Sequence, residues 1–181
     1  MRRVLIVLAV AAAVPVAVSV SANAKRKPPS SPHRTTLQRE LQAVKAATAR
    51  YHSFKQARRA GYSVAGEPCV ASPLGTMGIH ATNAALMANP GINPLRPEIL
   101  LYVRKGNGKL RLVGLEYWKA DADGKLATAN DRPSLFGHAF DGPMPGHNPT
   151  MPVHYDLHVW IWKANPSGMF AQFNPTLSCT P

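Results

Sequence analysis

The clearest pattern of hydrophobic and polar positions lies between Pro152 and Trp162, where the two classes alternate at every residue. Alternation with a period of two is typical of a strand, because successive side chains point to opposite faces of a sheet. One predicted face is apolar and consists of Val153, Tyr155, Leu157, Val159 and Ile161. The other face carries imidazoles, a carboxylate and indoles, namely His154, Asp156, His158, Trp160 and Trp162. The first face predicts a buried core, and the second predicts a face that binds a metal or a small polar ligand.

A second pattern predicts one amphipathic helix near the start of the chain, from Thr35 or Thr36 to about Ala60. Apolar residues recur there at helical spacing, from Leu37 to Phe54. Gly61 follows a basic turn, which is typical of a helix end.

The remaining pattern predicts strands joined by long loops. Strands are expected over 98–104 and 110–118, joined by a turn at 105–108, with a short strand over 135–140. A second hairpin is expected from 153–163 and 169–173. The stretches 61–93 and 141–151 are rich in Gly and Pro and are expected to be irregular, apart from a short helix near 83–88. The predicted fold is therefore α+β, with the N-terminal helix packed on an antiparallel sheet of four to five strands.

The first 24 residues have the pattern of an export signal. Arg2 and Arg3 precede an apolar run from Val4 to Val20, and Ala22-Asn23-Ala24 forms a cleavage site. We expect cleavage near Ala24 and a secreted or periplasmic bacterial protein. An uncleaved membrane anchor is the alternative, although the run is short for a span of roughly 20 residues. Residues 25–34 predict a basic, Pro/Ser-rich linker, and 35–181 a single globular domain without a membrane span.

Two cysteines, Cys69 and Cys179, are present in the chain. In an oxidising compartment an even pair predicts one disulfide bond between them. Zinc binding by the two thiolates is the alternative.

The net charge of +12 is unevenly distributed. The segment Lys25–Ala60 holds ten basic residues and one acid, Glu40, whereas the chain from Gly61 onward is close to neutral. A charge confined to one segment does not favour specific binding to nucleic acid. It predicts contact of Lys25–Arg59 with an anionic cell envelope.

Histidine positions decide which side chains could share a metal. On a strand, His154 and His158 would lie about 13 Å apart, so one ion would need ligands from other segments as well. The candidate ligands are His80, Glu116, His147, His154, Asp156 and His158. Such a set suits a transition metal such as zinc, copper or iron. Trp160 or Trp162 would flank the site, and Asn83 would bind a ligand or cap the short helix. The alternative is a purely structural cluster of hydrogen-bonded side chains.

Catalytic motifs give little support for an enzyme. The glutamate that follows the first histidine in the helical motif of zinc proteases is replaced by Tyr155, and no G-x-S-x-G motif occurs. We therefore expect a secreted binding domain without catalytic residues. Two alternatives stay open: an extracellular metal-dependent enzyme, hydrolytic or oxidative, and a cell-envelope interaction protein with structural histidines.

Four motifs carry a resemblance to a known family. They are M-G-I-H-x-x-N from Met77, P-E-I-L-L-Y from Pro97, L-V-G-L-E-Y from Leu112, and H-V-W-x-W-x-x-N-P-x-G-x-F-x-x-x-N-P-x-x-x-C from His158 to Cys179. From about Tyr51 onward, the chain resembles a family of uncharacterised small secreted bacterial proteins of actinobacterial type. The resemblance implies a shared fold but no activity. It also implies an aromatic residue where Ala81 stands and a tryptophan where Phe173 stands, and hence a more open site around His80.

Overall fold

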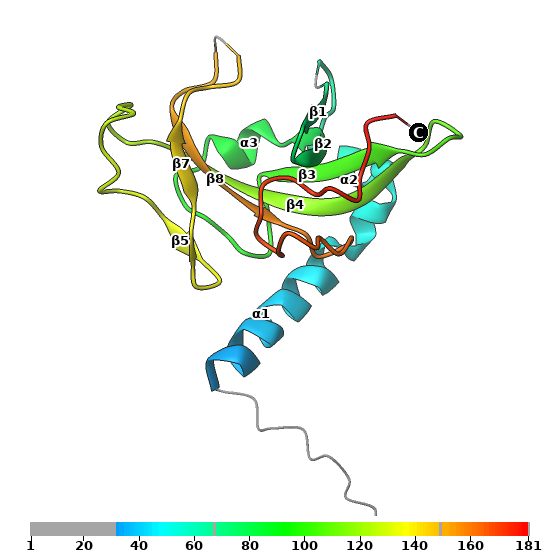
Figure 1. The fold of residues 1–181 in the computed structure, drawn as a ribbon, viewed down its shortest axis with the longest axis horizontal. Helices are drawn as coiled ribbons and strands as arrows, with labels where there is room; N and C mark the ends of the chain where they lie inside the picture. Colours follow the sequence, from blue (N-terminus) through cyan, green and yellow to red (C-terminus); the bar gives the residue numbers. More distant parts are fainter. Residues whose placement is uncertain (1–31, 67, 149, 181) are drawn as a thin grey trace, which may run out of the picture. The chain divides into compact units, whose positions relative to one another are not determined.

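An antiparallel sheet of six strands organises the chain in this computed structural model, which describes residues 32–66, 68–148 and 150–180 (Figure 1). In spatial order the strands are β1 (Cys69–Ser72), β2 (Gly75–Thr82), β3 (Ile99–Arg104), β4 (Leu110–Ala120), β8 (His154–Val159) and β7 (Asp141–Met144). The predicted α+β class and the antiparallel pairing are confirmed, and the sheet has one strand more than the upper expected number.

The helical segment differs from the single helix that was expected. Helix α1 (Pro32–Thr48) is followed by a 3-10 turn (Ala49–His52) and then by α2 (Phe54–Arg59). The break turns Tyr51 into the core, where the Tyr102 hydroxyl donates to the Tyr51 carbonyl at 2.6 Å. Gly61, with a φ of +95°, follows the last turn as expected. Helix α1 begins at Pro32, inside the predicted linker. Proline is compatible with this position because the first turn of a helix does not need its backbone N–H.

The predicted signal, residues 1–24, and most of the predicted linker lie outside the described residues. None of the helices in 32–66, 68–148 or 150–180 combines the length and the hydrophobicity needed to cross a bilayer.

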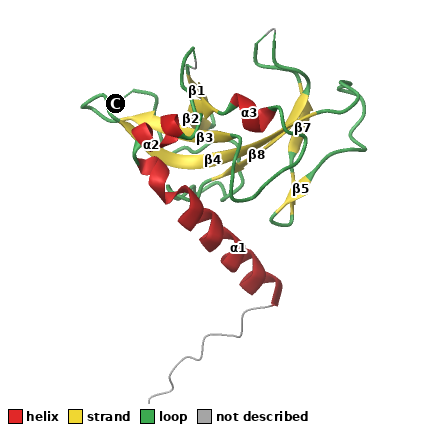
Figure 2. Ribbon diagram, turned by 180° about the vertical axis from the view of Figure 1, so that it is seen from behind, coloured by secondary structure: helices red, strands yellow, loops and turns green. Residues whose placement is uncertain are grey.

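Both faces of the sheet are buried, and they differ in composition. One face, here called the core face, carries alternate residues of β2, β3, β4 and β8 in a single hydrophobic cluster, for example Ile79, Leu100, Leu115 and Leu157. Leu37, Leu41 and Val44 of α1 pack against this cluster, and Figure 2 shows α1 on that side of the sheet. The opposite face, here called the site face, has a smaller apolar cluster around Ile99, Leu101, Trp118 and Trp160.

Three strands, β1, β2 and β7, lie in stretches that the sequence predicted to be irregular. In β2, Gly78 adopts a φ of +105°, and a Cβ there would lie 2.5 Å from the Tyr102 carbonyl oxygen. Glycine is therefore required for close strand packing at this position, although it makes the stretch resemble a loop. In β7, Gly142 and Pro143 are tolerated because β7 is an edge strand of the sheet.

The predictions for two short segments were wrong in detail. The single strand expected over 135–140 is a two-stranded ribbon of β5 (Ser134–Leu135) and β6 (His138–Ala139). The segment 169–173 consists of turns and bends instead of the second half of a hairpin. Short helix α3 (Ala84–Met87) is confirmed.

The C-terminal segment is tied to strands β1 and β2 of the sheet. The backbone of Asn174 exchanges two hydrogen bonds with Thr76 of β2, each of 3.1 Å. The Asn174 side chain also donates to the carbonyl of Ala164 at 3.2 Å. The predicted disulfide between Cys69 and Cys179 is present and joins β1 to the chain end.

Candidate metal centre

Three polar side chains from three strands meet on the site face: His80 of β2, Glu116 of β4 and His158 of β8. Glu116 and His158 are direct partners in the β4–β8 pairing, which places their side chains next to each other. His80 lies on β2, and β3 separates it from β4. All three residues are buried, with relative exposures of 7, 2 and 0 %.

The distances between the three side chains match those of a metal site. Glu116 Oε2 lies 3.1 Å from His80 Nε2 and 3.6 Å from His158 Nε2. One ligand atom from each residue lies within 4.8 Å of the other two. Two ligands at about 2.05 Å from a tetrahedral zinc ion are roughly 3.3 Å apart. The three side chains can therefore reach a common ion with only small adjustments.

Charge also concentrates at these side chains. Burial opposes the charged form of Glu116, but the nearby imidazoles of His80 and His158 lower the pKa of its carboxyl to about 2. Burial likewise opposes the charged form of His158, but the carboxylates of Glu116 and Asp156 raise the pKa of its imidazole to about 9. At neutral pH the metal-free site therefore holds an anionic Glu116 beside a cationic His158, and a metal cation would take the place of the imidazole proton.

Asp156 supports His158 from the same strand. Its Oδ1 lies 3.5 Å from His158 Nδ1, on the side of the ring opposite the nitrogen that faces Glu116. A carboxylate on the second ring nitrogen is the usual partner of a metal-binding histidine, because it fixes the orientation of the ring. Asp156 is thus placed to position a ligand rather than to be one. Its strand partner in β7 is Asp141, whose carboxyl pKa is raised by burial and by the charge of Asp156.

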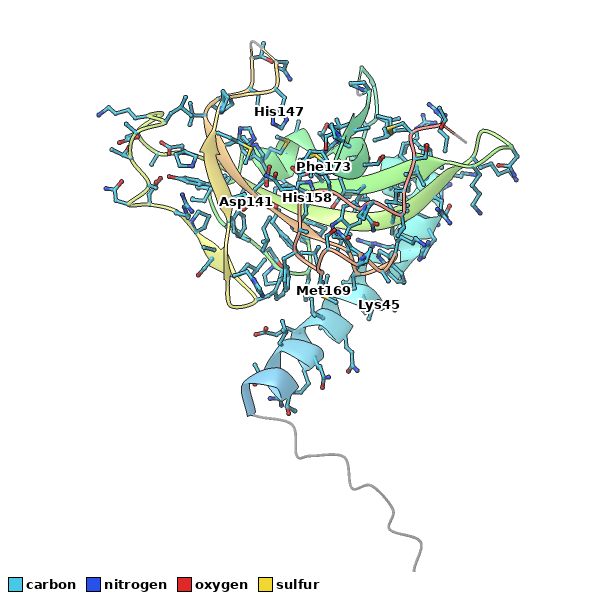
Figure 3. The ribbon with its side chains drawn as sticks, in the orientation of Figure 1. Lys45, Asp141, His147, His158, Met169 and Phe173 are labelled. Atoms are coloured by element: carbon cyan, nitrogen blue, oxygen red, sulfur yellow. A yellow bond between two sulfur atoms is a disulfide. The ribbon has the colours of Figure 1, made fainter. Side chains whose placement is uncertain are left out.

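A cavity of about 510 Å³ opens beside these residues and has His80 and Glu116 in its wall. The wall also includes the two other candidate histidines, His147 and His154. His147 is exposed on the loop between β7 and β8, and its ring centroid lies 5.1 Å from that of His154 (Figure 3). Neither histidine belongs to the group of three that converges on a common point within the described part of the chain.

His154 is fully buried and has a defined tautomer. Its Nδ1 lies 3.0 Å from the carbonyl oxygen of Pro152, which can only accept a hydrogen bond, so Nδ1 carries the proton. Burial lowers the pKa of the His154 imidazole, which favours the neutral form. The other nitrogen, Nε2, is then an acceptor.

The expected flanking residues are placed differently from one another. Trp160 is buried on the site face, with its ring 6.3 Å from that of His158, and its Nε1 donates to the Ala171 carbonyl. Trp162 instead lies against the core-face cluster, with its ring 4.3 Å from that of His52 and beneath the ammonium of Lys45. Strand β8 ends at Val159, so the alternation no longer determines the face at Trp162.

Asn83 lies outside the cavity wall and caps helix α3. Its side chain accepts from the Leu86 backbone N–H at 3.2 Å and donates to the Ala60 carbonyl at 2.9 Å. Both ends of the amide are therefore used structurally, as the capping alternative predicted.

Several residues of the cavity wall escaped the sequence analysis, among them Trp118 and Ile99. Trp118 follows Glu116 by two positions on β4, and its ring stacks on that of His154 with centroids 5.7 Å apart. The same period of two that was applied to β8 would have placed Trp118 beside Glu116.

Ala81 and Phe173, the two positions at which the resemblance implied larger aromatic residues, lie in different places. Ala81 is fully buried on the core face, so an aromatic residue there would extend away from His80. This corrects the expectation that Ala81 opens the site. Phe173 does line the cavity, so its smaller ring is relevant to the size of the cavity.

Comparison of the chain with protein-family models, with curated proteins and with solved structures finds no match.

Proposed function

We propose that this protein binds a divalent transition metal, such as Zn²⁺ or Fe²⁺, through His80, Glu116 and His158. The observation that carries the proposal is the convergence of three ligand atoms from three different strands. Two histidines and one carboxylate form the ligand set of many catalytic zinc sites and of non-haem iron sites.

Hydrogen bonding favours a metal over a purely structural cluster. Glu116 Oε2 and both ring nitrogens of His158 are buried without a well-directed hydrogen bond from any described residue. Buried polar groups in a structural cluster are normally hydrogen-bonded, because an unpartnered group costs about 1–3 kcal/mol. Glu116 Oε2 and His158 Nε2 lie 3.6 Å apart yet form no well-directed hydrogen bond, which is the arrangement expected when both atoms are directed at a shared ion.

Export from a bacterial cell is part of the same proposal. It is supported by the disulfide between Cys69 and Cys179, a bond that persists in oxidising compartments. Membership of the actinobacterial-type family is likewise a proposal. It is supported by the structural use of its motif residues, such as Gly78 in β2 and Asn174, which pairs with β2.

The test is the metal content of the full chain, expressed with its export signal and purified without a histidine tag. Elemental mass spectrometry is expected to find about one transition-metal ion per chain. The variants Glu116→Gln and His80→Ala are expected to lose the metal, whereas His138→Ala, an exposed histidine outside the cavity, keeps it. Thermal unfolding followed by circular dichroism shows that each variant is folded. A folded wild-type chain that takes up no metal from Zn²⁺ or Fe²⁺ solutions contradicts the proposal.

A metal-dependent enzyme is the second candidate function. It is favoured by the number of protein ligands, because three ligands leave a coordination position open, as in catalytic zinc sites, and a cavity adjoins the cluster. Turnover of a chromogenic ester, abolished by a chelator and restored by the metal, would support this candidate. The same assay in Glu116→Gln is expected to show no turnover.

Contact with an anionic cell envelope stays a prediction of the sequence. The basic side chains of α1 and α2, among them Arg39, Lys45, Lys55 and Arg58, are exposed to solvent. Salt-sensitive attachment to envelope fragments is the measurement that tests it.

A further inference from the structure

The cavity beside the candidate metal centre combines a few polar side chains with a largely apolar wall. Its apolar wall consists of Val70, Met77, Ile99, Met151 and Phe173. Glu116 is the only charged side chain among the described lining residues when the histidines are neutral, and it is a metal ligand in the proposed function. The volume of about 510 Å³ is within the range of pockets that hold small organic molecules.

Two further polar side chains in the wall have unused hydrogen-bonding atoms. Trp118 Nε1 is buried and donates to no described residue, and His154 Nε2 is buried and accepts from none. Their relative exposures are 7 and 0 %, and their rings stack against each other at an interplanar angle of 29°. Nδ1 of His154 is committed to the Pro152 carbonyl, which makes Nε2 an acceptor. One donor and one acceptor on adjacent rings of the wall residues are therefore without a partner among the described residues.

These features define the chemistry of a complementary occupant. A hydroxyl group can accept from Trp118 Nε1 or donate to His154 Nε2, because it has both a proton and lone pairs. An apolar body matches the two methionines and the phenylalanine, of which the methionines adapt to different shapes. With no cationic Lys or Arg among the described lining residues, the bound metal is the group that attracts an anion.

We infer that this cavity binds a small monocarboxylic acid with an apolar, hydroxyl-bearing body, its carboxylate on the metal and its hydroxyl on Trp118 and His154. This inference rests on the proposed function, because the metal supplies the positive charge that holds the carboxylate. It goes further by assigning a ligand class to the cavity and a recognition role to Trp118 and His154.

The position of Trp118 makes the two ends of such a ligand compatible with one cavity. Glu116 and Trp118 are alternate residues of β4, so their side chains leave the same face of the strand about 6.6 Å apart. A benzene ring can carry a carboxylate and a hydroxyl group on one rigid apolar body. Aromatic hydroxy acids are therefore suitable probes, with the unsubstituted acid as the matched reference.

The experiment compares benzoate, 3-hydroxybenzoate and 4-hydroxybenzoate by isothermal titration calorimetry on the metal-loaded full chain. Benzamide, which is neutral, serves as the control for the carboxylate. We expect benzoate to bind and benzamide to bind at least about tenfold more weakly. At least one hydroxybenzoate is expected to bind about fivefold more tightly than benzoate, the gain of roughly one net hydrogen bond. In the Co²⁺-loaded protein, the visible spectrum is expected to change on binding, which reports a new metal ligand.

The variants Trp118→Phe and His154→Phe keep a ring in each position and remove its nitrogen. Within each variant, we expect the ratio of hydroxybenzoate affinity to benzoate affinity to lose part or all of the gain from the hydroxyl group. Trp162→Phe is the matched control, because Trp162 packs on the core face, and it is expected to keep the whole gain. If one of the two variants does not fold, the other still tests the hydroxyl contact, since both nitrogens are assigned to the same group.

Metal content measured on the same samples separates the two proposals. A metal-loaded wild type that binds none of the acids at millimolar concentration overturns the ligand assignment and leaves the metal site intact. Equal affinities for benzoate and both hydroxybenzoates overturn the role of Trp118 and His154. A wild-type chain that holds no metal contradicts the proposed function, and the ligand assignment fails with it.

Discussion

The core face and the site face of the sheet are built from neighbouring residues of the same strands, yet their buried polar side chains differ in hydrogen bonding. On the core face, the hydroxyl groups of Tyr62, Tyr102 and Tyr117 each donate to a backbone carbonyl at 2.6 Å. On the site face, Glu116 and His158 are as deeply buried, but several of their polar atoms lack a well-directed partner among the described residues. Burial alone thus does not reveal the role of a polar side chain, whereas the state of its hydrogen bonds does. Among the described residues, most of the buried polar atoms without a partner belong to the site face, and Trp162 Nε1 on the core face is an exception.

The sharpest way to break this comparison is a substitution on the core face alone. Leu157 is 2 % exposed on β8, directly beside the site-face residues Asp156 and His158. Leu157→Ala removes buried methyl groups and leaves a void, so we expect the free energy of unfolding to fall by about 3 kcal/mol. Urea unfolding monitored by circular dichroism measures the loss. Metal content per folded chain is expected to stay unchanged, and loss of the metal in the folded variant would show that the two faces are not independent.

A substitution confined to the site face can be made one residue away, at Asp156. Asp156→Asn removes the carboxylate that orients His158, so we expect metal affinity to fall roughly 10–100-fold. Competition with a chromogenic chelator measures the affinity. Asp123→Asn, at an exposed carboxylate of the loop after β4, is the control and is expected to have no effect. Equal affinities of Asp156→Asn and wild type would remove Asp156 from the site.

The stability of the metal-free protein is expected to depend on pH through two charged residues of the site face, His158 and Glu116. The pKa of His158 is raised to about 9 in the folded state, so its stabilising contribution is fully present below about pH 6.5 and is lost as the pH rises through 9. The slope is of the order of 1 kcal/mol per pH unit in that window. Glu116, whose pKa is lowered to about 2, contributes above about pH 4.5 and loses its contribution on acidification. Urea unfolding in the presence of a chelator at a series of pH values measures both effects.

The titration of Glu98 also changes stability with pH and must be removed to isolate the effect of His158. Burial raises the pKa of its carboxyl to about 7, so its contribution is also lost with rising pH, but in a lower window. Glu98→Gln keeps an acceptor for the Trp118 backbone N–H while removing this titration. In that background, a stability that is constant between pH 7 and 9 would contradict the assignment of His158.

The smallest effect is expected at Trp162. Trp162→Phe weakens the contact with the Lys45 ammonium, which lies 5.2 Å from the ring centroid, and should lower stability by less than about 1 kcal/mol. Metal affinity is expected to be unchanged, because Trp162 belongs to the core face. A fall in metal affinity would place this ring back on the site face, where the alternation along the sequence first put it.

Local pattern was enough to predict part of this arrangement. The period of two in β8 placed His154, Asp156 and His158 on one face and Tyr155, Leu157 and Val159 on the other, and both assignments hold. The strand spacing also implied that His154 and His158 do not meet at one ion, and only His158 belongs to the converging group. These results follow from the geometry of a single strand.

Other features depend on which strands are neighbours, and no local pattern carries that information. Glu116 faces His158 because of the register between β4 and β8, which the sequence of neither strand specifies. His80 was expected in an irregular loop because Gly75 and Gly78 interrupt the strand pattern, although Gly78 is what lets β2 approach Tyr102. Trp162 was misplaced because a strand that ends at Val159 gives no face to the residues after it.

The spread of the three candidate ligands over β2, β4 and β8 has a consequence for the order of assembly. His80, Glu116 and His158 come together only when pairings between distant parts of the chain have formed, and such pairings are slow because long loops must close first. An unfolded or half-folded chain offers only separate, weak ligands. Under the proposed function, metal binding would therefore be a late folding event that follows completion of the sheet, and loss of the ion would remove a link between three strands at once.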